Sequence, residues 1–152
     1  MKRTKFYIQT ILAWFFFLPI LVFATDTTYF VVGNQGYDLV SYFTDNRAVK
    51  GNGDHFVTRS GINYLFVSDE HKKMFQANPE KYLSQFGGWC AFGVAVNRKV
   101  PGDPLVWKIV DGKLYLNLNE KVAKIWAKNM PVYIKKAEAN WPKIKDKDPS
   151  QF

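Results

Sequence analysis

The side chains that could carry chemistry are few, and three of them lie within 20 positions of one another: His71, Met74 and Cys90. His71 and Met74 share one face if this segment is helical, because residues three apart lie within about one turn. Imidazole, thioether and thiolate together suit soft copper(I), whereas zinc takes more nitrogen, sulfur or carboxylate ligands. We predict a copper(I) or zinc site with Cys90 as the principal ligand, His71 as the second and Met74 as the third.

The same residues also have structural interpretations. Met74 suits a core facing a hairpin, and His71 suits an exposed or capping position. Cys90 is the one cysteine of the chain, and free cysteines are among the most buried residue types. One alternative is therefore a non-catalytic protein-interaction or small-ligand-binding domain with an inert, buried Cys90. Another is a thiol redox protein that uses Cys90 alone, which would require an exposed thiol of low pKa.

The sequence shows no catalytic signature. A nucleophilic cysteine needs a nearby base and a third group that orients it. His71 could be the base, but no aspartate or asparagine stands out as the orienting group. Gly87-Gly88 is no phosphate-binding loop, since no Lys-Ser pair follows it. We expect a protein that is not an enzyme.

Length and charge set the class of protein. The 152 residues suffice for one domain, and the formal net charge is +8. From Asn119 onward there are eight lysines and four acidic residues, which is typical of a solvated helical face. The same excess favours anionic partners, so weak contact with an anionic membrane surface is a second interpretation. No nucleic acid is expected.

Residues 1–24 have the features of a signal peptide. Lys2, Arg3 and Lys5 precede an apolar stretch over 6–23, and Ala24 provides a small residue before a polar segment. We predict export to the periplasm or the extracellular space after cleavage. The alternative is an uncleaved N-terminal membrane anchor, since about 18 apolar residues can span a bilayer.

The elements that would position the candidate ligands follow from turn and cap residues. Ser68 is a good N-cap, Asn78-Pro79 ends one helix and begins the next, and Asp111-Gly112 is a strong hairpin signal. In chain order we predict strands over 29–32, 55–58 and 62–67, helices over 68–77 and 79–86, strands over 107–110 and 113–118, a helix capped by Asn119, and a last helix over 130–140. This is an α+β domain of two units, each a β-hairpin followed by a helix pair.

A resemblance to a known family rests on residues 62–90, INYLFVSDEHKKMFQANPEKYLSQFGGWC. This segment resembles the YHS domain, which has an aromatic-rich strand, a serine, an acidic-His helix start and an F-x-x-N-P-x-K-Y motif. GYDLVSYFTDNRAVKG at 36–51, GGWCAFGVA at 87–95 and DPLVWKIVDGKLYLNLN at 103–119 are similar to the exported single-domain branch. The resemblance covers nearly all of the chain after residue 24 and implies a YHS-like domain over 25–142. Residues 143–152 are charged, and we expect them to form a flexible tail.

The resemblance also carries a functional expectation. YHS domains occur beside heavy-metal transport modules, so it implies transition-metal binding and a metal-transport or envelope protein as a partner. Many members carry additional cysteines in two places. This chain has Leu39-Val40-Ser41-Tyr42 at the first place and Val67 before Ser68 at the second, so both places lack a cysteine.

Overall fold

The computed structural model describes residues 31–152. The predicted signal peptide over 1–24 and the first half of the predicted strand over 29–32 lie outside these residues. Within 31–152, no helix has both the length and the apolar character needed to cross a membrane.

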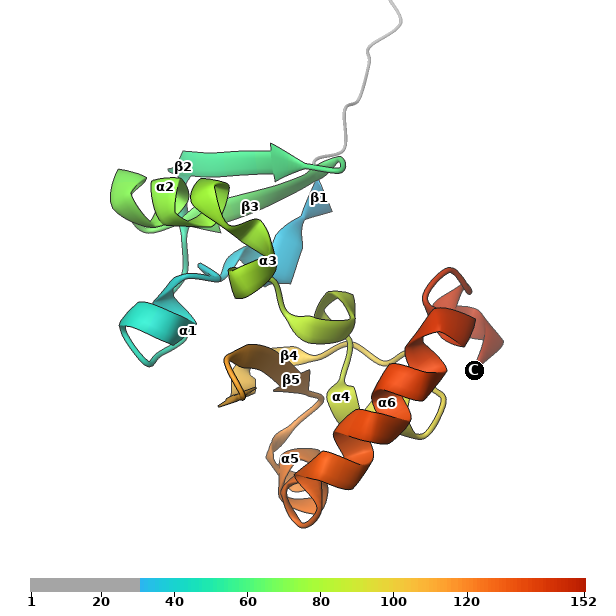
Figure 1. Cartoon of the computed structure of the whole chain (residues 1–152). Helices are drawn as coiled ribbons and strands as arrows, with labels where there is room; N and C mark the ends of the chain where they lie inside the picture. The colour runs from blue at the N-terminus through green and yellow to red at the C-terminus, as the bar shows by residue number, and fades with distance from the viewer. Residues whose placement is uncertain (1–30) are drawn as a thin grey trace, which may run out of the picture.

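The described part of the chain folds into helices and two small sheets (Figure 1). The strands are β1 (Val31–Val32), β2 (Asn52–Arg59), β3 (Ile62–Phe66), β4 (Asp103–Val110) and β5 (Lys113–Asn117). The α-helices are α1 (Ser41–Thr44), α2 (Asp69–Ala77), α3 (Pro79–Tyr82), α4 (Ala91–Ala95), α5 (Glu120–Ala127) and α6 (Met130–Ile144). Three short 3₁₀ turns complete the fold: η1 (Gly33–Gly36), η2 (Gln85–Gly88) and η3 (Pro149–Gln151).

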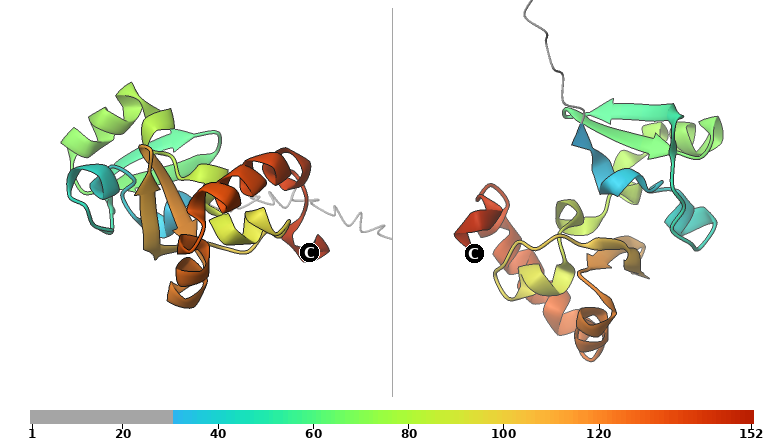
Figure 2. Two further views of the ribbon diagram at one scale, coloured as in Figure 1. Left: turned by 60° about the horizontal axis from the view of Figure 1, so that its bottom comes forward. Right: turned by 180° about the vertical axis from the view of Figure 1, so that it is seen from behind.

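The predicted α+β class is confirmed. The first sheet has the order β1-β3-β2, in which β1 is parallel to β3 and β2 is antiparallel to it. The second sheet is the antiparallel pair β4-β5. Helices α2 and α3 follow the first hairpin, and α5 and α6 follow the second. Figure 2 shows the two sheets in different halves of the molecule, with α4, α5 and α6 grouped around the second.

Local residue chemistry explains both hairpins. Asp111 and Gly112 have φ of 49° and 71°, and Ser60 and Gly61 have φ of 51° and 75°. Two successive residues at positive φ are what a type I′ turn requires, and this turn matches the twist of antiparallel strands. The predicted Asp-Gly hairpin is therefore present.

The predicted caps also form. Ser68 Oγ accepts a hydrogen bond from the His71 backbone N–H at 3.2 Å, and Asn119 Oδ1 accepts one from Val122 N–H at 2.9 Å. Asn78 caps α3, whose first residue is Pro79. Each cap satisfies a backbone donor that has no partner within its helix.

Several elements differ from the prediction: β2 and β4 begin earlier than expected, at Asn52 and Asp103, and α1 was not predicted. The helix expected over 79–86 ends at Tyr82, because Leu83 and Ser84 adopt non-helical ψ of 134° and 137°. Helix α4 falls where no element was predicted. Helix α6 continues through Pro142 to Ile144, although proline removes a helical hydrogen bond. Ile144 is 1% exposed, so burial of the last turn outweighs that loss.

The last ten residues, expected to form a flexible tail, lie partly against the fold. Residues 143–144 belong to α6, and 149–151 form η3. The Lys99 ammonium donates hydrogen bonds to the carbonyls of Lys145 and Lys147 at 2.9 and 2.7 Å. The Phe152 side chain packs against buried residues of the second half.

Strand β5 lies between two hydrophobic clusters. The first cluster comprises Leu39, Val40, Tyr42, Phe66, Phe75, Tyr82, Leu114 and Leu116. The second comprises Phe86, Ala91, Val94, Ala95, Tyr115, Trp126, Ala137 and Ile144. Successive side chains of a strand point to opposite faces, so Leu114 and Leu116 enter the first cluster while Tyr115 enters the second.

Candidate functional site

The strongest polar arrangement in the described chain is a carboxylate–imidazole pair, Asp38 and His71. Asp38 lies between η1 and α1, and His71 lies in the first turn of α2. His71 Nδ1 is 2.7 Å from Asp38 Oδ2. The Asp38 side chain is fully buried, whereas the His71 side chain keeps 12% of its surface exposed.

Backbone donors fix the Asp38 carboxylate. Its Oδ1 accepts hydrogen bonds from the N–H groups of Val40 at 2.8 Å and Ser41 at 3.4 Å. Its Oδ2 accepts one from Val67 N–H at 3.0 Å. An ionised carboxylate can only accept hydrogen bonds, so the His71 nitrogen that faces it must be the N–H donor. This leaves Nε2 as the outward-facing ring atom of His71.

The Nε2 atom faces a second carboxylate. It lies 3.4 Å from Thr44 Oγ1 and 3.9 Å from Asp45 Oδ1. With its hydrogen on Nδ1, the imidazole directs the Nε2 lone pair toward Thr44 and Asp45. The gap between Nε2 and Asp45 Oδ1 is therefore lined by two atoms that can act as metal ligands.

The order Thr44, His71, Asp38 also matches a hydroxyl–imidazole–carboxylate triad. However, the Thr44 hydroxyl lies within hydrogen-bond distance of Val40 O at 3.2 Å and Asp45 Oδ1 at 2.8 Å. Its 3.4 Å separation from Nε2 is longer than the ~2.6–3.2 Å over which a base takes a proton. The arrangement suits cation binding better than activation of Thr44.

Of the three predicted ligands, the structure keeps His71 and Met74 on α2 but places Cys90 elsewhere. Met74 packs against the first hydrophobic cluster. Cys90 precedes α4 beside β5, in the other half of the molecule (Figure 1). No group of three or more His, Cys, Asp and Glu side chains within residues 31–152 is arranged to hold a metal ion.

Cys90 has its own local partners. It is 1% exposed and caps α4, with Sγ accepting from Gly93 N–H at 3.4 Å. The thiol also lies 3.7 Å from Asn117 Oδ1, which in turn accepts a hydrogen bond from Phe92 N–H. These contacts give the sulfur the role that a serine oxygen has at an N-cap.

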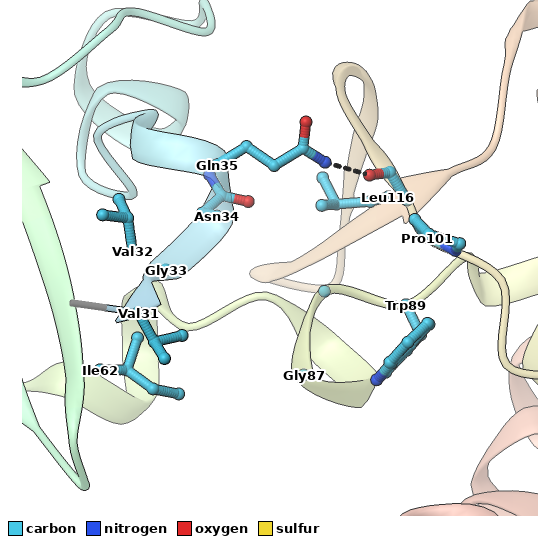
Figure 3. Close-up of a pocket in the computed structure, with 12 residues that line it drawn as sticks. Val31, Val32, Gly33, Asn34, Gln35, Ile62, Gly87, Trp89, Pro101 and Leu116 are labelled. Carbon is cyan, nitrogen blue, oxygen red and sulfur yellow. Dashed lines mark hydrogen bonds between the residues drawn. The ribbon is translucent and has the colours of Figure 1, made fainter. Parts of the chain in front are cut away.

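A groove of about 250 Å³ lies where the first sheet approaches the second half of the molecule (Figure 3). The Gln35 amide spans one side, donating to Gly102 O at 2.9 Å. Asn34 Oδ1, in the groove wall, is buried without a hydrogen-bond partner within the described residues. The lining residues are Val31, Val32, Gly33, Asn34, Gln35, Ile62, Gly87, Gly88, Trp89, Pro101, Gly102 and Leu116.

Sequence reasoning missed Asp38 and Asp45. The available signal was the segment YDLVS, because an aspartate that begins a turn can accept hydrogen bonds from the next N–H groups. Asp38 precedes His71 by 33 positions in the chain. Nothing in the sequence indicates that the two side chains come into contact. The other histidine, His55, is 3.0 Å from Asp69 Oδ1 in a separate, more exposed pair.

Comparison with known proteins adds no assignment: no family model, no curated protein and no solved structure matches this chain.

Proposed function

We propose that this protein is an exported, non-catalytic module of the YHS type that binds one divalent transition-metal ion at His71. The observation that carries the proposal is the 2.7 Å contact between His71 Nδ1 and the buried Asp38 carboxylate. Histidines that ligate metals almost always donate their other ring N–H to such a group, which fixes the ring and raises its basicity.

Asp45 supplies a second ligand. A tetrahedral ion with bonds of ~2.0–2.2 Å holds two ligand atoms about 3.4 Å apart. A shift of about 0.5 Å would bring His71 Nε2 and Asp45 Oδ1, which are 3.9 Å apart, to that separation. Water, the Thr44 hydroxyl or a partner protein would complete the coordination. With nitrogen and oxygen donors, copper(II) and zinc are favoured over copper(I).

The test is a metal titration of the purified protein by calorimetry, with copper(II) EPR as a second readout. We expect one ion per chain, binding that is lost in His71→Ala, and about tenfold weaker binding in Asp45→Asn. His55→Ala is the matched control, since His55 also contacts a carboxylate, and it should leave the affinity unchanged. Equal binding by wild type and His71→Ala would refute the proposal.

Cys90→Ser separates this site from the thiolate site predicted from the sequence. A serine at this position keeps the N-cap of α4 and removes the sulfur. If His71 is the principal ligand, Cys90→Ser retains full metal affinity. Loss of binding in this variant, with His71→Ala unaffected, would move the site to Cys90.

A second candidate function is small-ligand binding in the groove with an inert Cys90. It is favoured by the mostly apolar lining of the groove at the junction of two structural units, where ligand sites are common. A fragment screen by NMR should shift the amide signals of Gly33, Gly88 and Gly102. Under this hypothesis Cys90 also resists thiol reagents until the protein unfolds. Rapid modification of the folded protein would count against it.

A further inference from the structure

Helix α5 and the first half of α6 carry a concentrated positive charge. Residues 121–137 contain five lysines and no acidic residue. These lysines, Lys121, Lys124, Lys128, Lys135 and Lys136, are all exposed, and none takes part in an ion pair within residues 31–152. The nearest acids along the chain are Glu120, in the first turn of α5, and Glu138, which contacts Lys113 at 3.7 Å. We call residues 121–136 the α5–α6 corner.

The corner also exposes apolar side chains beside the lysines. Ile125 is 37% exposed and Val132 is 42% exposed. Ile125 shares a helix face with Lys121, and Val132 shares one with Lys136, because residues four apart on a helix are neighbours. Figure 1 shows α5 and the start of α6 at the end of the molecule opposite the first sheet. The corner therefore protrudes from the fold.

We propose that the α5–α6 corner docks on an anionic membrane surface. Charge complementarity selects this partner, since each lysine near an anionic bilayer adds a favourable attraction. The apolar residues distinguish a membrane from a soluble polyanion. Ile125 and Val132 can enter the interface while the lysine stems lie along it and keep their ammonium groups at the headgroups.

The experiment is sedimentation of the full chain with vesicles of phosphatidylcholine, alone or mixed with phosphatidylserine. We expect binding to the mixed vesicles only, and a decrease as salt is added. Lys121→Glu/Lys135→Glu/Lys136→Glu should weaken binding by at least about a hundredfold. Lys121 lies in the first turn of α5, and Lys135 and Lys136 lie inside α6. Glutamate is tolerated at these positions, so both helices should persist in the variant. Circular dichroism checks this.

Two further variants make the result specific. Ile125→Ser/Val132→Ser should weaken vesicle binding about tenfold without changing binding to heparin, a soluble polyanion. Lys73→Glu/Lys81→Glu, which reverses exposed lysines of the first half, should stay within about threefold of wild type. Failure to bind mixed vesicles, or equal losses in the two lysine variants, would overturn the proposal. Unchanged vesicle binding in the serine variant would also overturn it, in favour of a soluble polyanion.

Discussion

At the scale of single residues, Asp38 has the most demanding environment. A fully buried carboxylate must be hydrogen-bonded to offset its lost hydration, and Asp38 accepts from three backbone N–H groups besides His71. Those donors belong to the start of α1 and to the residue after β3, so the side chain joins two segments to α2. Asp38 therefore serves stability whether or not His71 holds a metal ion.

Asp38→Asn should lower the free energy of unfolding by about 2–3 kcal/mol. The variant replaces one carboxylate oxygen with an amide nitrogen, which is a donor and cannot accept. That nitrogen would face the N–H groups of Val67 and His71 at the Oδ2 position, or those of Val40 and Ser41 at the Oδ1 position. Asp45→Asn is the control, because Asp45 lies in an exposed turn and its side chain keeps 29% of its surface accessible, so its change should cost less than about 0.5 kcal/mol. Urea denaturation measures both. Similar losses in the two variants would contradict this role of Asp38.

The Tyr42 hydroxyl gives a prediction about alkaline pH. Burial raises the pKa of Tyr42 above its ordinary value of 10.0, opposed by the hydrogen bond from Asn34. Since the folded state favours the neutral phenol, this contribution to stability is complete below pH 10 and is lost as the pH rises above it. Burial also raises the pKa of Tyr64 and Tyr115. We therefore expect the tyrosinate absorbance of these three side chains to appear together with unfolding.

Tyr42→Phe tests this assignment. It removes the hydrogen bond to Pro104 O, 3.0 Å long, and should cost about 1–2 kcal/mol at neutral pH. Above pH 10 the variant should lose stability less steeply than wild type. Unfolding curves from pH 8 to 11 measure the slope, and parallel slopes would show that Tyr42 does not contribute to it.

At the scale of elements, the turn and cap residues were the reliable part of the sequence. Ser68, Asn119 and Asp111-Gly112 act through neighbours in the chain, so both hairpins and most helix starts could be predicted. Helix α4 could not be predicted from the sequence, because it has only five residues and its cap is a cysteine. The Asp38–His71 contact could not be predicted either, since it depends on how η1, α1 and α2 pack in three dimensions.

The segment that follows α6 is held by a contact from the loop between α4 and β4. Lys99 is only 8% exposed, and its ammonium contacts the Lys145 and Lys147 carbonyls and lies 4.9 Å from the centre of the Trp89 ring. A cation at a helix C-terminus satisfies free carbonyls and interacts favourably with the helix dipole. Lys99 therefore explains why residues 145–147 lie against the fold.

Lys99→Met should release residues 145–152 and lower the free energy of unfolding by about 1–2 kcal/mol. Limited proteolysis should then cleave after Lys145 or Lys147 faster than in wild type. Lys108→Met, at an exposed strand position, is the control and should leave the cleavage rate unchanged. Equal rates in wild type and Lys99→Met would show that other contacts hold this segment.

At the scale of the whole molecule, β5 contributes side chains to the cores of both halves, so we expect the halves to unfold as one cooperative unit. Leu114 and Tyr115 are both almost fully buried, yet they contribute to different hydrophobic clusters. The predicted division into two hairpin-and-helix units matched β2-β3-α2-α3 and β4-β5-α5-α6 but left out α1 and α4. It did not indicate that one strand would serve both cores, because the pattern LYL is apolar at every position and marks no single buried face.

Leu114→Ala tests this cooperativity. Removing a fully buried leucine side chain should cost about 2–5 kcal/mol, and the loss should appear in both halves. Tryptophan fluorescence includes Trp126 of the second cluster, while far-ultraviolet circular dichroism follows both halves. We expect the two denaturation curves to coincide in wild type and variant. Separate midpoints would mean that the halves unfold independently.

The position of β5 has a consequence for any ligand of the first half. A molecule that binds only the native state lowers the population of the globally opened state by the factor 1 + [L]/Kd, wherever on the surface it binds. If both cores open together, an ion at His71 protects the most slowly exchanging amides of α6 from deuterium as strongly as those of β3. Hydrogen exchange in the distant helix would then report occupancy of a site it never touches.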